Sequence, residues 1–185
     1  MSAVRLLVLG AVRRRGQAHG YQVRADLESW GAHQWSSATS GSVYHALKAM
    51  TREGLLLVHE TTPSKAGGPP RMEYEVTDAG EQTYFELLNT ALTSRDPRLD
   101  LLAAAVGLIE DLPREQAIEL LRRRAKVMDE WRASITADLP PGTDLDSWGP
   151  IGEVIGLWLH TAEGRADWTH RLIRRLAEGA YRMAG

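Results

Sequence analysis

The sequence predicts a mainly α-helical protein with one small β-hairpin, in which an N-terminal unit containing the hairpin precedes an all-helical second half. Apolar residues recur at helical spacing along most of the chain. Two runs, LLLVHE at 55–60 and RMEYEVT at 71–77, instead have strand character and flank a loop rich in Pro, Gly and Ser. We therefore expect two domains, at residues 1–93 and 94–185.

Composition limits the classes of protein that fit. A chain of 185 residues with 43% hydrophobic residues can form one medium core or two small ones. A net charge of −2 does not fit a protein that coats nucleic acid indiscriminately, so any DNA contact needs a local basic patch. Cysteine is absent, which excludes disulfides and thiolate metal sites. The first apolar run is too short to span a bilayer, and its basic residues follow it, so we expect a cytoplasmic protein without a membrane segment.

Three short helices are expected before the hairpin. Residues 3–14 are apolar at mixed spacing, which predicts a largely buried helix. The second helix covers about 21–30 and the third about 42–52, and a glycine follows each. Between them, RGQAHG is interpreted as a turn and HQWSSATSG as a polar connection.

Further helices are expected after the hairpin. Thr77 is a good N-cap for a helix that continues to about residue 92. The others are expected at 98–110, 114–138 and about 151–183. The apolar stripe of the last helix is longer than one small domain needs to cover, which favours a twofold homodimer.

Arg124 interrupts the apolar stripe of the helix at 114–138. If it is buried, its guanidinium must meet an acid or carbonyl oxygens, within the chain or across a dimer. Alternatively, the helix is rotated so that the Arg124 side chain extends to solvent.

The order helix, helix, helix, strand, loop, strand is that of a winged helix-turn-helix, whose recognition helix enters the major groove of DNA. At about 100° per residue, the face of the third helix opposite Val43, Leu47 and Met50 carries hydrogen-bond donors and no acid. The candidate DNA-contacting residues of this face are Ser42, His45, Lys48 and Arg52. Ser42 also stands at the helix start, where backbone N–H groups can hold a phosphate. The alternative is an ordinary solvated helix face.

The loop of the hairpin, SKAGGPPR, contains no acidic residue. Lys65 and Arg71 bracket a glycine pair that lets the backbone approach a phosphate closely. We therefore expect Lys65, Gly68 and Arg71 to contact DNA, the alternative being a hairpin that only adds solubility.

Three segments agree in order and spacing with one known family over about residues 3–82. They are LLVLGAVRRRGQAHGYQVRADLESWG, SGSVYHALKAMTREGLL and GGPPRMEYEVTDAGE. They resemble the PadR family of transcriptional regulators. The resemblance implies a winged helix, a homodimer made by C-terminal helices, repression relieved by a small molecule, and DNA contacts from the recognition helix and Tyr44. By its helical position Tyr44 flanks the exposed face, so we expect it to meet a backbone phosphate. Glu73 and Glu75 in the second wing strand are acidic, which departs from the family's pattern. If their side of the strand faces DNA, the wing contact is weaker than the family's pattern implies.

Three tryptophans in the second half, Trp131, Trp148 and Trp158, are candidate effector-binding residues, because flat aromatic side chains stack on planar ligands. The alternative is that they are anchors of the core and the dimer interface. The expected partners are double-stranded DNA with a pseudo-palindromic operator, a second copy of the chain and a small aromatic effector.

The chain contains no P-loop, nucleophile elbow or cysteine nucleophile, so we expect neither an enzyme nor a cofactor. His160, Glu163, Asp167 and His170 share one side of the last helix at metal-like spacing. Basic residues share that side as well, so we interpret it as a solvated face without a metal. Two rival hypotheses remain, a winged helix that binds protein and not DNA, and an enzyme that uses the histidine-bearing face.

Overall fold

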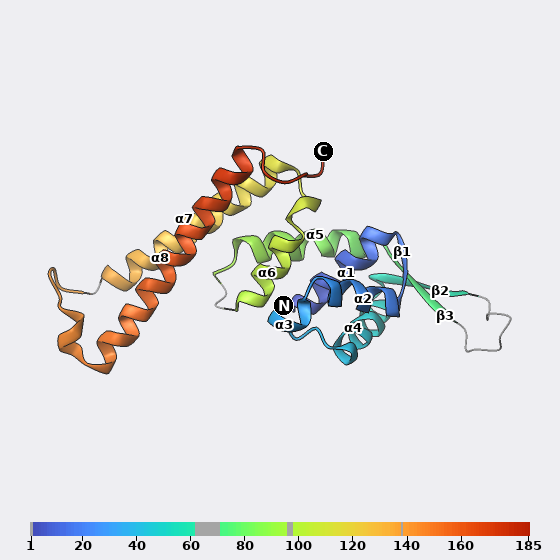
Figure 1. Ribbon diagram of the computed structural model, residues 1–185, viewed down its shortest axis with the longest axis horizontal. Coiled ribbons are helices and arrows are strands. Elements are labelled where there is room, and N and C mark those ends of the chain that lie inside the picture. The colour runs from blue at the N-terminus through green and yellow to red at the C-terminus, as the bar shows by residue number, and fades with distance from the viewer. Residues whose placement is uncertain (1, 62–70, 96–97, 138) are drawn as a thin grey trace. The chain divides into compact units, whose positions relative to one another are not determined.

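The computed structural model describes residues 2–61, 71–95, 98–137 and 139–185 (Figure 1). The chain divides into two compact units. The first consists of Met1–Ala91 with Pro97–Leu108, and the second of Leu92–Asp96 with Ile109–Gly185. In the described part of the chain, no helix has both the length and the apolar character needed to cross a membrane.

The first unit combines short helices with a small sheet, as predicted. Its elements are α1 (Ala3–Arg15), β1 (Gln17–His19), α2 (Gly20–Ser29), α3 (Ala32–Trp35), α4 (Ser40–Arg52), β2 (Leu56–Thr61), β3 (Arg71–Val76), the greater part of α5 (Asp78–Thr93) and α6 (Leu99–Gly107). Helix α1 packs against α2, α4, α6 and β3, so it is the centre of this unit. Its apolar residues from Val4 to Val12 are all buried, which confirms the predicted buried helix.

The sheet has three antiparallel strands in the order β1-β3-β2, not the two that the sequence predicted. Tyr74 in β3 lies opposite Ala18 in β1 and Val58 in β2. Strand β1 occupies part of the segment that we interpreted as a turn, and α3 lies in the segment interpreted as a polar connection. Both elements are very short, and β1 obtains its hydrogen bonds from a strand far away in sequence, so neither has a local periodic signal.

Helix α5 begins as the sequence predicted. The Gly80 N–H donates to Thr77 Oγ1 over 3.0 Å, which is the hydrogen bond of an N-cap residue. The Thr77 hydroxyl in turn donates to the Gly54 carbonyl over 2.8 Å and so fixes the helix start to the end of α4. Tyr84 and Leu88 of α5 are fully buried in the core of the first unit.

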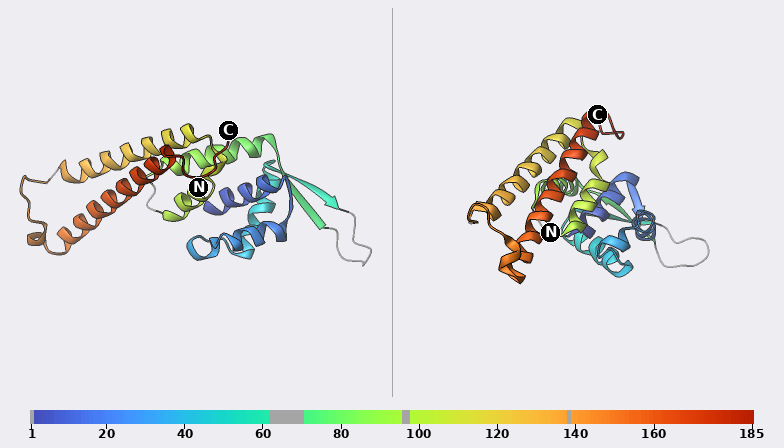
Figure 2. Two further views of the ribbon diagram at one scale, coloured as in Figure 1. Left: turned by 45° about the horizontal axis from the view of Figure 1, so that its top comes forward. Right: turned by 60° about the vertical axis from the view of Figure 1, so that its left-hand side comes forward.

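The second unit is built around α7 (Arg114–Ala137) and α8 (Pro150–Ala177), with two short 3₁₀ segments, η1 (Ile109–Asp111) and η2 (Leu145–Trp148). Figure 2 shows α7 and α8 lying side by side. The buried residues of the two helices include Leu121, Met128, Ala162 and Leu176.

Helix α8 ends at Ala177, six residues before the predicted end at 183. Gly179 follows with a φ of 88°, a left-handed conformation that terminates helices. The Ala180 N–H donates back to the Arg175 carbonyl over 2.8 Å, which completes this C-terminal motif. Our prediction was therefore wrong at this end, and Gly179 is the signal that it overlooked.

Arg124 is buried, with 1% of its surface exposed, which rules out the extension to solvent. Its Nη1 donates to the Ser94 carbonyl, as one of the predicted alternatives required. Among the described residues, its Nε and Nη2 have no hydrogen-bond partner. Burial, and then the positive charge of Arg165, lower the pKa of Arg124 to about 10.

Candidate nucleic-acid interface

Helix α4 is fixed at its start by a reciprocal cap between Thr39 and Ser42. The Ser42 N–H donates to Thr39 Oγ1 over 3.2 Å, and the Thr39 N–H donates to Ser42 Oγ over 2.9 Å. Ser42 Oγ also lies 2.7 Å from the Ser37 carbonyl oxygen, a suitable acceptor for its proton. The hydroxyl of Ser42 is thus engaged within the helix cap, and its contact with DNA stays a prediction.

The two faces of α4 have the polarity that the sequence predicted. Val43, Leu47 and Met50 are at most 1% exposed and attach the helix to the core. The exposed side chains on the other side include Tyr44, His45, Lys48 and Arg52. The structure thus brings four of the predicted DNA-contacting residues together on one helix.

The acid that follows this helix is neutralised by α1. Glu53 accepts hydrogen bonds from both terminal nitrogens of Arg5, at 2.9 and 2.5 Å. These bonds lower the pKa of the Glu53 carboxyl, which therefore stays ionised and paired. The positive side chains of α4 are therefore not opposed by an uncompensated carboxylate at the helix end.

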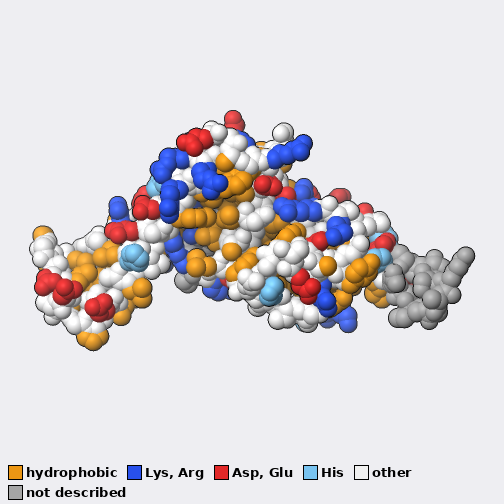
Figure 3. Space-filling model, in the orientation of Figure 1, with side chains coloured by type: hydrophobic (Ala, Val, Ile, Leu, Met, Phe, Trp, Pro, Cys, Tyr) orange, Lys and Arg blue, Asp and Glu red, His pale blue; other side chains and the backbone are white. Residues whose placement is uncertain are grey.

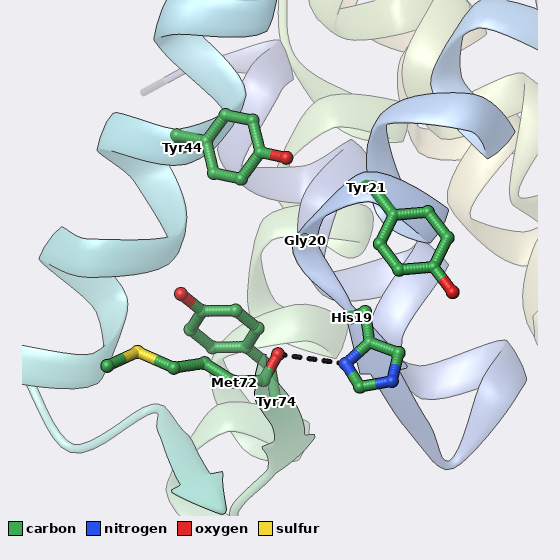
Figure 4. Close-up of a pocket in the computed structure, with 6 residues that line it drawn as sticks. All are labelled: His19, Gly20, Tyr21, Tyr44, Met72 and Tyr74. Carbon is green, nitrogen blue, oxygen red and sulfur yellow. Dashed lines mark hydrogen bonds between the residues drawn. The ribbon is translucent and has the colours of Figure 1, made fainter. Parts of the chain in front are cut away.

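An open hollow of about 450 Å³ lies beside α4 (Figure 4). It is lined by His19, Gly20, Tyr21, Tyr44, Met72 and Tyr74. These residues come from β1, α2, α4 and β3, so no local sequence pattern joins them, and the sequence identified only Tyr44. We call this group the aromatic cup.

The wall of the aromatic cup is held by contacts of His19. Its ring stacks on Tyr21 with centroids 5.4 Å apart, and its Nδ1 lies 3.2 Å from the Met72 carbonyl oxygen. Tyr74 is largely buried at the base, and its burial, followed by the neighbouring Tyr44, raises the pKa of its phenol. Tyr74 therefore keeps its proton at neutral pH and remains a hydrogen-bond donor.

The two wing acids are paired with side chains of neighbouring strands. Glu75 accepts a hydrogen bond from Gln17 over 3.0 Å and lies 2.7 Å from His59 Nε2, and Glu73 lies 3.1 Å from His19 Nε2. The contacts of Glu75 with Gln17 and then His59 lower its pKa. Side chains alternate along a strand, so Glu73 and Glu75 point to the opposite face from Met72 and Tyr74, which line the aromatic cup.

Three predicted wing residues are not placed. Lys65 and Gly68 lie outside the described residues, and Arg71 begins β3 without a described side chain. Their contacts with DNA stay predictions.

The segment that contains α4, β2 and β3 is similar to a known protein family. Residues 8–86 match the model of the transcriptional regulator PadR-like family. The similarity to this family therefore extends over the first part of the chain, from within α1 to within α5. No curated protein matches the chain.

Matches to solved PadR structures extend over most of the length of this chain. The Bacillus subtilis PadR in complex with operator DNA is 18% identical, with a TM-score of 0.43, and the match covers 93% of this chain and 98% of that one. The same protein in complex with p-coumaric acid is also 18% identical, with a TM-score of 0.39. That match covers 95% of this chain and 99% of the other. A PadR-like regulator from Bacillus cereus is 15% identical, with a TM-score of 0.40 and coverage of 95% and 98%.

In the second unit, the three candidate effector residues line one open hollow of about 440 Å³. Its wall consists of Arg95, Trp131, Ser134, Ile135, Leu139, Trp148, Ile155 and Trp158. Trp148 is 42% exposed and Trp158 50%, so their indole rings are accessible in a single chain. The Arg95 guanidinium lies 5.7 Å from the centre of the Trp131 ring. The structure thus brings the three tryptophans together, and their role stays a prediction.

The side of α8 that carries two histidines and two acids lies at the surface. His160, Glu163, Asp167 and His170 are all exposed. Within the described ranges, no group of three or more His, Asp and Glu side chains is arranged to hold a metal ion.

Proposed function

We propose that this chain is a DNA-binding transcriptional repressor that acts as a homodimer and is released from its operator by a small planar ligand. The observation that carries the proposal is the outer face of α4, where Tyr44, His45, Lys48 and Arg52 are exposed together. Residues 1–93 bind DNA and residues 94–185 provide dimerisation and effector binding. A regulator of this kind acts in the cytoplasm.

Helix α4 enters the major groove in this proposal. His45 is placed to reach base edges, while Lys48 and Arg52 carry the positive charge that phosphates require. Tyr44 contacts a backbone phosphate from the rim of the aromatic cup. The remaining contacts of the proposed set come from Ser42 at the helix start and from Lys65, Gly68 and Arg71 in the wing.

A second copy covers apolar surface of α8. Figure 3 shows hydrophobic side chains at the surface of the α7–α8 hairpin. Exposed hydrophobic residues of α8 are Ile151 at 67%, Val154 at 45%, Leu157 at 62% and Trp158 at 50%. Such a continuous apolar stripe is typical of an interaction surface. A twofold dimer buries it symmetrically and requires a pseudo-palindromic operator.

The ligand that releases DNA binds among Trp131, Trp148 and Trp158. Indole rings provide flat apolar surfaces on which a planar molecule stacks. Because the two DNA-binding units of a dimer are joined only through their C-terminal helices, a ligand at these helices changes the half-site spacing without touching DNA.

Binding to genomic DNA fragments, beginning with the region upstream of the chain's own gene, tests the proposal. We expect one fragment to be retained in an electrophoretic shift, and light scattering to give about twice the 20.5 kDa chain mass. A monomer that retains no fragment contradicts the proposal and favours the alternative, a winged helix that binds another protein. Linkage tests the effector: operator DNA must weaken ligand binding by the same factor by which the ligand weakens DNA binding.

A further inference from the structure

The aromatic cup brings together tyrosines from three elements of the first unit. Tyr21 comes from α2, Tyr44 from α4 and Tyr74 from β3, and Figure 4 shows their rings on different sides of the hollow. Only Tyr44 lies on the proposed recognition helix. Tyr21 is 54% exposed, more than Tyr44 at 38%. Tyrosine is enriched in binding surfaces because its ring is apolar and its hydroxyl is polar, so the cup is a candidate site in its own right.

The hydroxyls of Tyr44 and Tyr74 are available to a ligand. In the part of the chain that the structure describes, neither forms a hydrogen bond with another group. Tyr74 is 7% exposed, so packing fixes its ring at the base of the cup. Burial, and then Tyr44, raise the pKa of the Tyr74 phenol, which is therefore protonated at neutral pH and can donate a hydrogen bond.

The charges around the cup favour an anion. None of the described residues that line it is acidic. Glu73 and Glu75 point to the opposite face of β3, where both are paired with histidines of neighbouring strands. Lys48 stands one turn after Tyr44 on the same side of α4 and is exposed. A negatively charged group in the cup therefore meets hydroxyl donors and a nearby ammonium group.

The cup also has apolar walls, which the side chain of Met72 and the ring of Tyr21 provide. Met72 is 48% exposed at this surface. One unit of the DNA backbone matches such a lining, because its deoxyribose has apolar faces and its phosphate is an anion with strong hydrogen-bond acceptors. A volume of about 450 Å³ is within the range of about 300–1,000 Å³ that ligand sites have. The cup is open and lies beside α4, where the backbone passes a helix that has entered the major groove.

We propose that the aromatic cup binds one sugar–phosphate unit of operator DNA. The deoxyribose packs against Tyr21 and Met72, and the hydroxyl of Tyr74 donates to the phosphate that Tyr44 also contacts. This inference rests on the proposed function, because it requires α4 to lie in the adjacent groove. It adds contacts from α2 and β3 to those of the recognition helix. Phosphate contacts of this kind fix the orientation of a protein on the duplex, so the cup sets the register of α4 in the groove.

Single methylphosphonate substitutions along the operator test the proposal. Each replaces one charged phosphate oxygen by a methyl group, and the affinity of the full chain is measured by fluorescence anisotropy. We expect one position in each half-site where the substitution weakens wild-type binding by about tenfold, the effect of losing a charge-assisted hydrogen bond. Tyr74→Phe should weaken binding to the unmodified operator by about the same factor. At that one position the variant should lose clearly less than wild type, because the two changes remove the same contact.

Three further variants separate the ring from the hydroxyl and provide a control. Tyr21→Ala removes an apolar wall and should weaken operator binding, whereas Tyr21→Phe keeps the ring and should bind like wild type. Tyr181→Phe changes an exposed tyrosine of the second unit and should also keep the wild-type affinity. Tyr74→Phe retains the buried ring and loses a hydroxyl that has no partner in the described part of the chain, so its free energy of unfolding should match that of wild type.

The outcomes distinguish this site from the proposed function. Full operator affinity in Tyr74→Phe, with binding still weakened in Lys48→Ala, would refute the site in the cup and leave the proposed function intact. A loss in Tyr74→Phe that is the same at every substituted phosphate would also refute it, because the hydroxyl would then act only through the structure. A wild-type chain that retains no DNA fragment would overturn both.

Discussion

The ring of Tyr44 in α4 rests directly on the backbone of Gly20 at the start of α2. A Cβ added at Gly20 would lie 2.6 Å from Tyr44 Cε1, closer than any ordinary carbon contact. Gly20 thus sets the position of the phenol at the rim of the aromatic cup. Gly20, which we do not expect to contact DNA, therefore determines where the Tyr44 side chain lies, and we expect Tyr44 to contact a DNA phosphate.

The variant Gly20→Ala should weaken operator binding with little loss of stability. The clash involves the far edge of an exposed ring, so Tyr44 can rotate away, but it then leaves the position that we assign to the phosphate contact. A hydrogen bond to a charged group contributes about 1.5–3 kcal/mol, which bounds the loss of binding free energy. Gly164→Ala in α8 is the control, since a Cβ there meets nothing within 4 Å. Equal operator affinity in Gly20→Ala and wild type, measured by fluorescence anisotropy, would show that the Tyr44 position does not matter.

Lys48→Ala should weaken binding to all DNA sequences alike. Lys48 is exposed on the outer face of α4, where a phosphate contact is independent of sequence. Its loss should reduce the slope of log affinity against log salt by about one unit. Lys126→Ala changes an exposed lysine of α7, serves as the control and should keep the wild-type slope.

By contrast, His45→Ala should reduce the free energy of binding by about 1–3 kcal/mol for the operator alone. Unchanged operator affinity in both α4 variants would mean that another face contacts DNA.

The elements with long apolar patterns were predictable from the sequence, and those made by distant pairing were not. Helices α1, α4, α5 and α7 follow directly from apolar spacing and caps. Strand β1 exists because β3 supplies its partners, and the aromatic cup exists because the fold joins His19, Tyr44 and Tyr74 from three elements. Such a cluster requires tertiary information, so the sequence could identify only Tyr44, which lies on the predicted recognition helix.

Gly80→Ala should destabilise the first unit. A Cβ at this position would lie 2.1 Å from the Leu55 backbone carbonyl oxygen, and backbone cannot move aside as a side chain does. Overpacking of this kind costs about 1–3 kcal/mol or more. The free energy of unfolding from denaturant titration should fall by this amount, whereas Gly164→Ala should unfold no more easily than wild type. Full stability of Gly80→Ala would contradict the close approach of α5 to the end of α4.

Arg114→Ala should destabilise the second unit through the C-terminus of α8. The Arg114 guanidinium donates to the carbonyls of Leu176, Ala180 and Tyr181 over 2.6, 2.8 and 2.8 Å. It therefore satisfies acceptors at and beyond the helix end that lack partners within the helix. We expect a loss of about 1.5–3 kcal/mol, and Arg114→Lys should recover part of it, since an ammonium cannot match the planar fork. Arg123→Ala breaks only an exposed pair with Glu119, so its melting temperature should be close to that of wild type.

Arg124→Met should stabilise the protein. Arg124 is buried and its pKa falls to about 10, because burial, and then Arg165, disfavour its charged form. Folding therefore carries an unfavourable contribution from this charge, which is present in full below about pH 10 and is relieved only as the pH rises from there toward the ordinary value for arginine. Between roughly pH 6 and 9 the contribution is constant, so the stabilisation should not vary with pH in that range.

Methionine fills a similar space without charge, and replacements of this kind often raise the free energy of unfolding by about 1–4 kcal/mol. The gain should be smaller here, because the Ser94 carbonyl loses its hydrogen-bond donor. Arg122→Met on the exposed side of α7 is the matched control and should change stability by less than about 0.5 kcal/mol. A loss of about 3–5 kcal/mol in Arg124→Met, measured by denaturant titration of the protein, would contradict this account. Such a loss would indicate that Arg124 pairs with a carboxylate of a second copy in the proposed dimer.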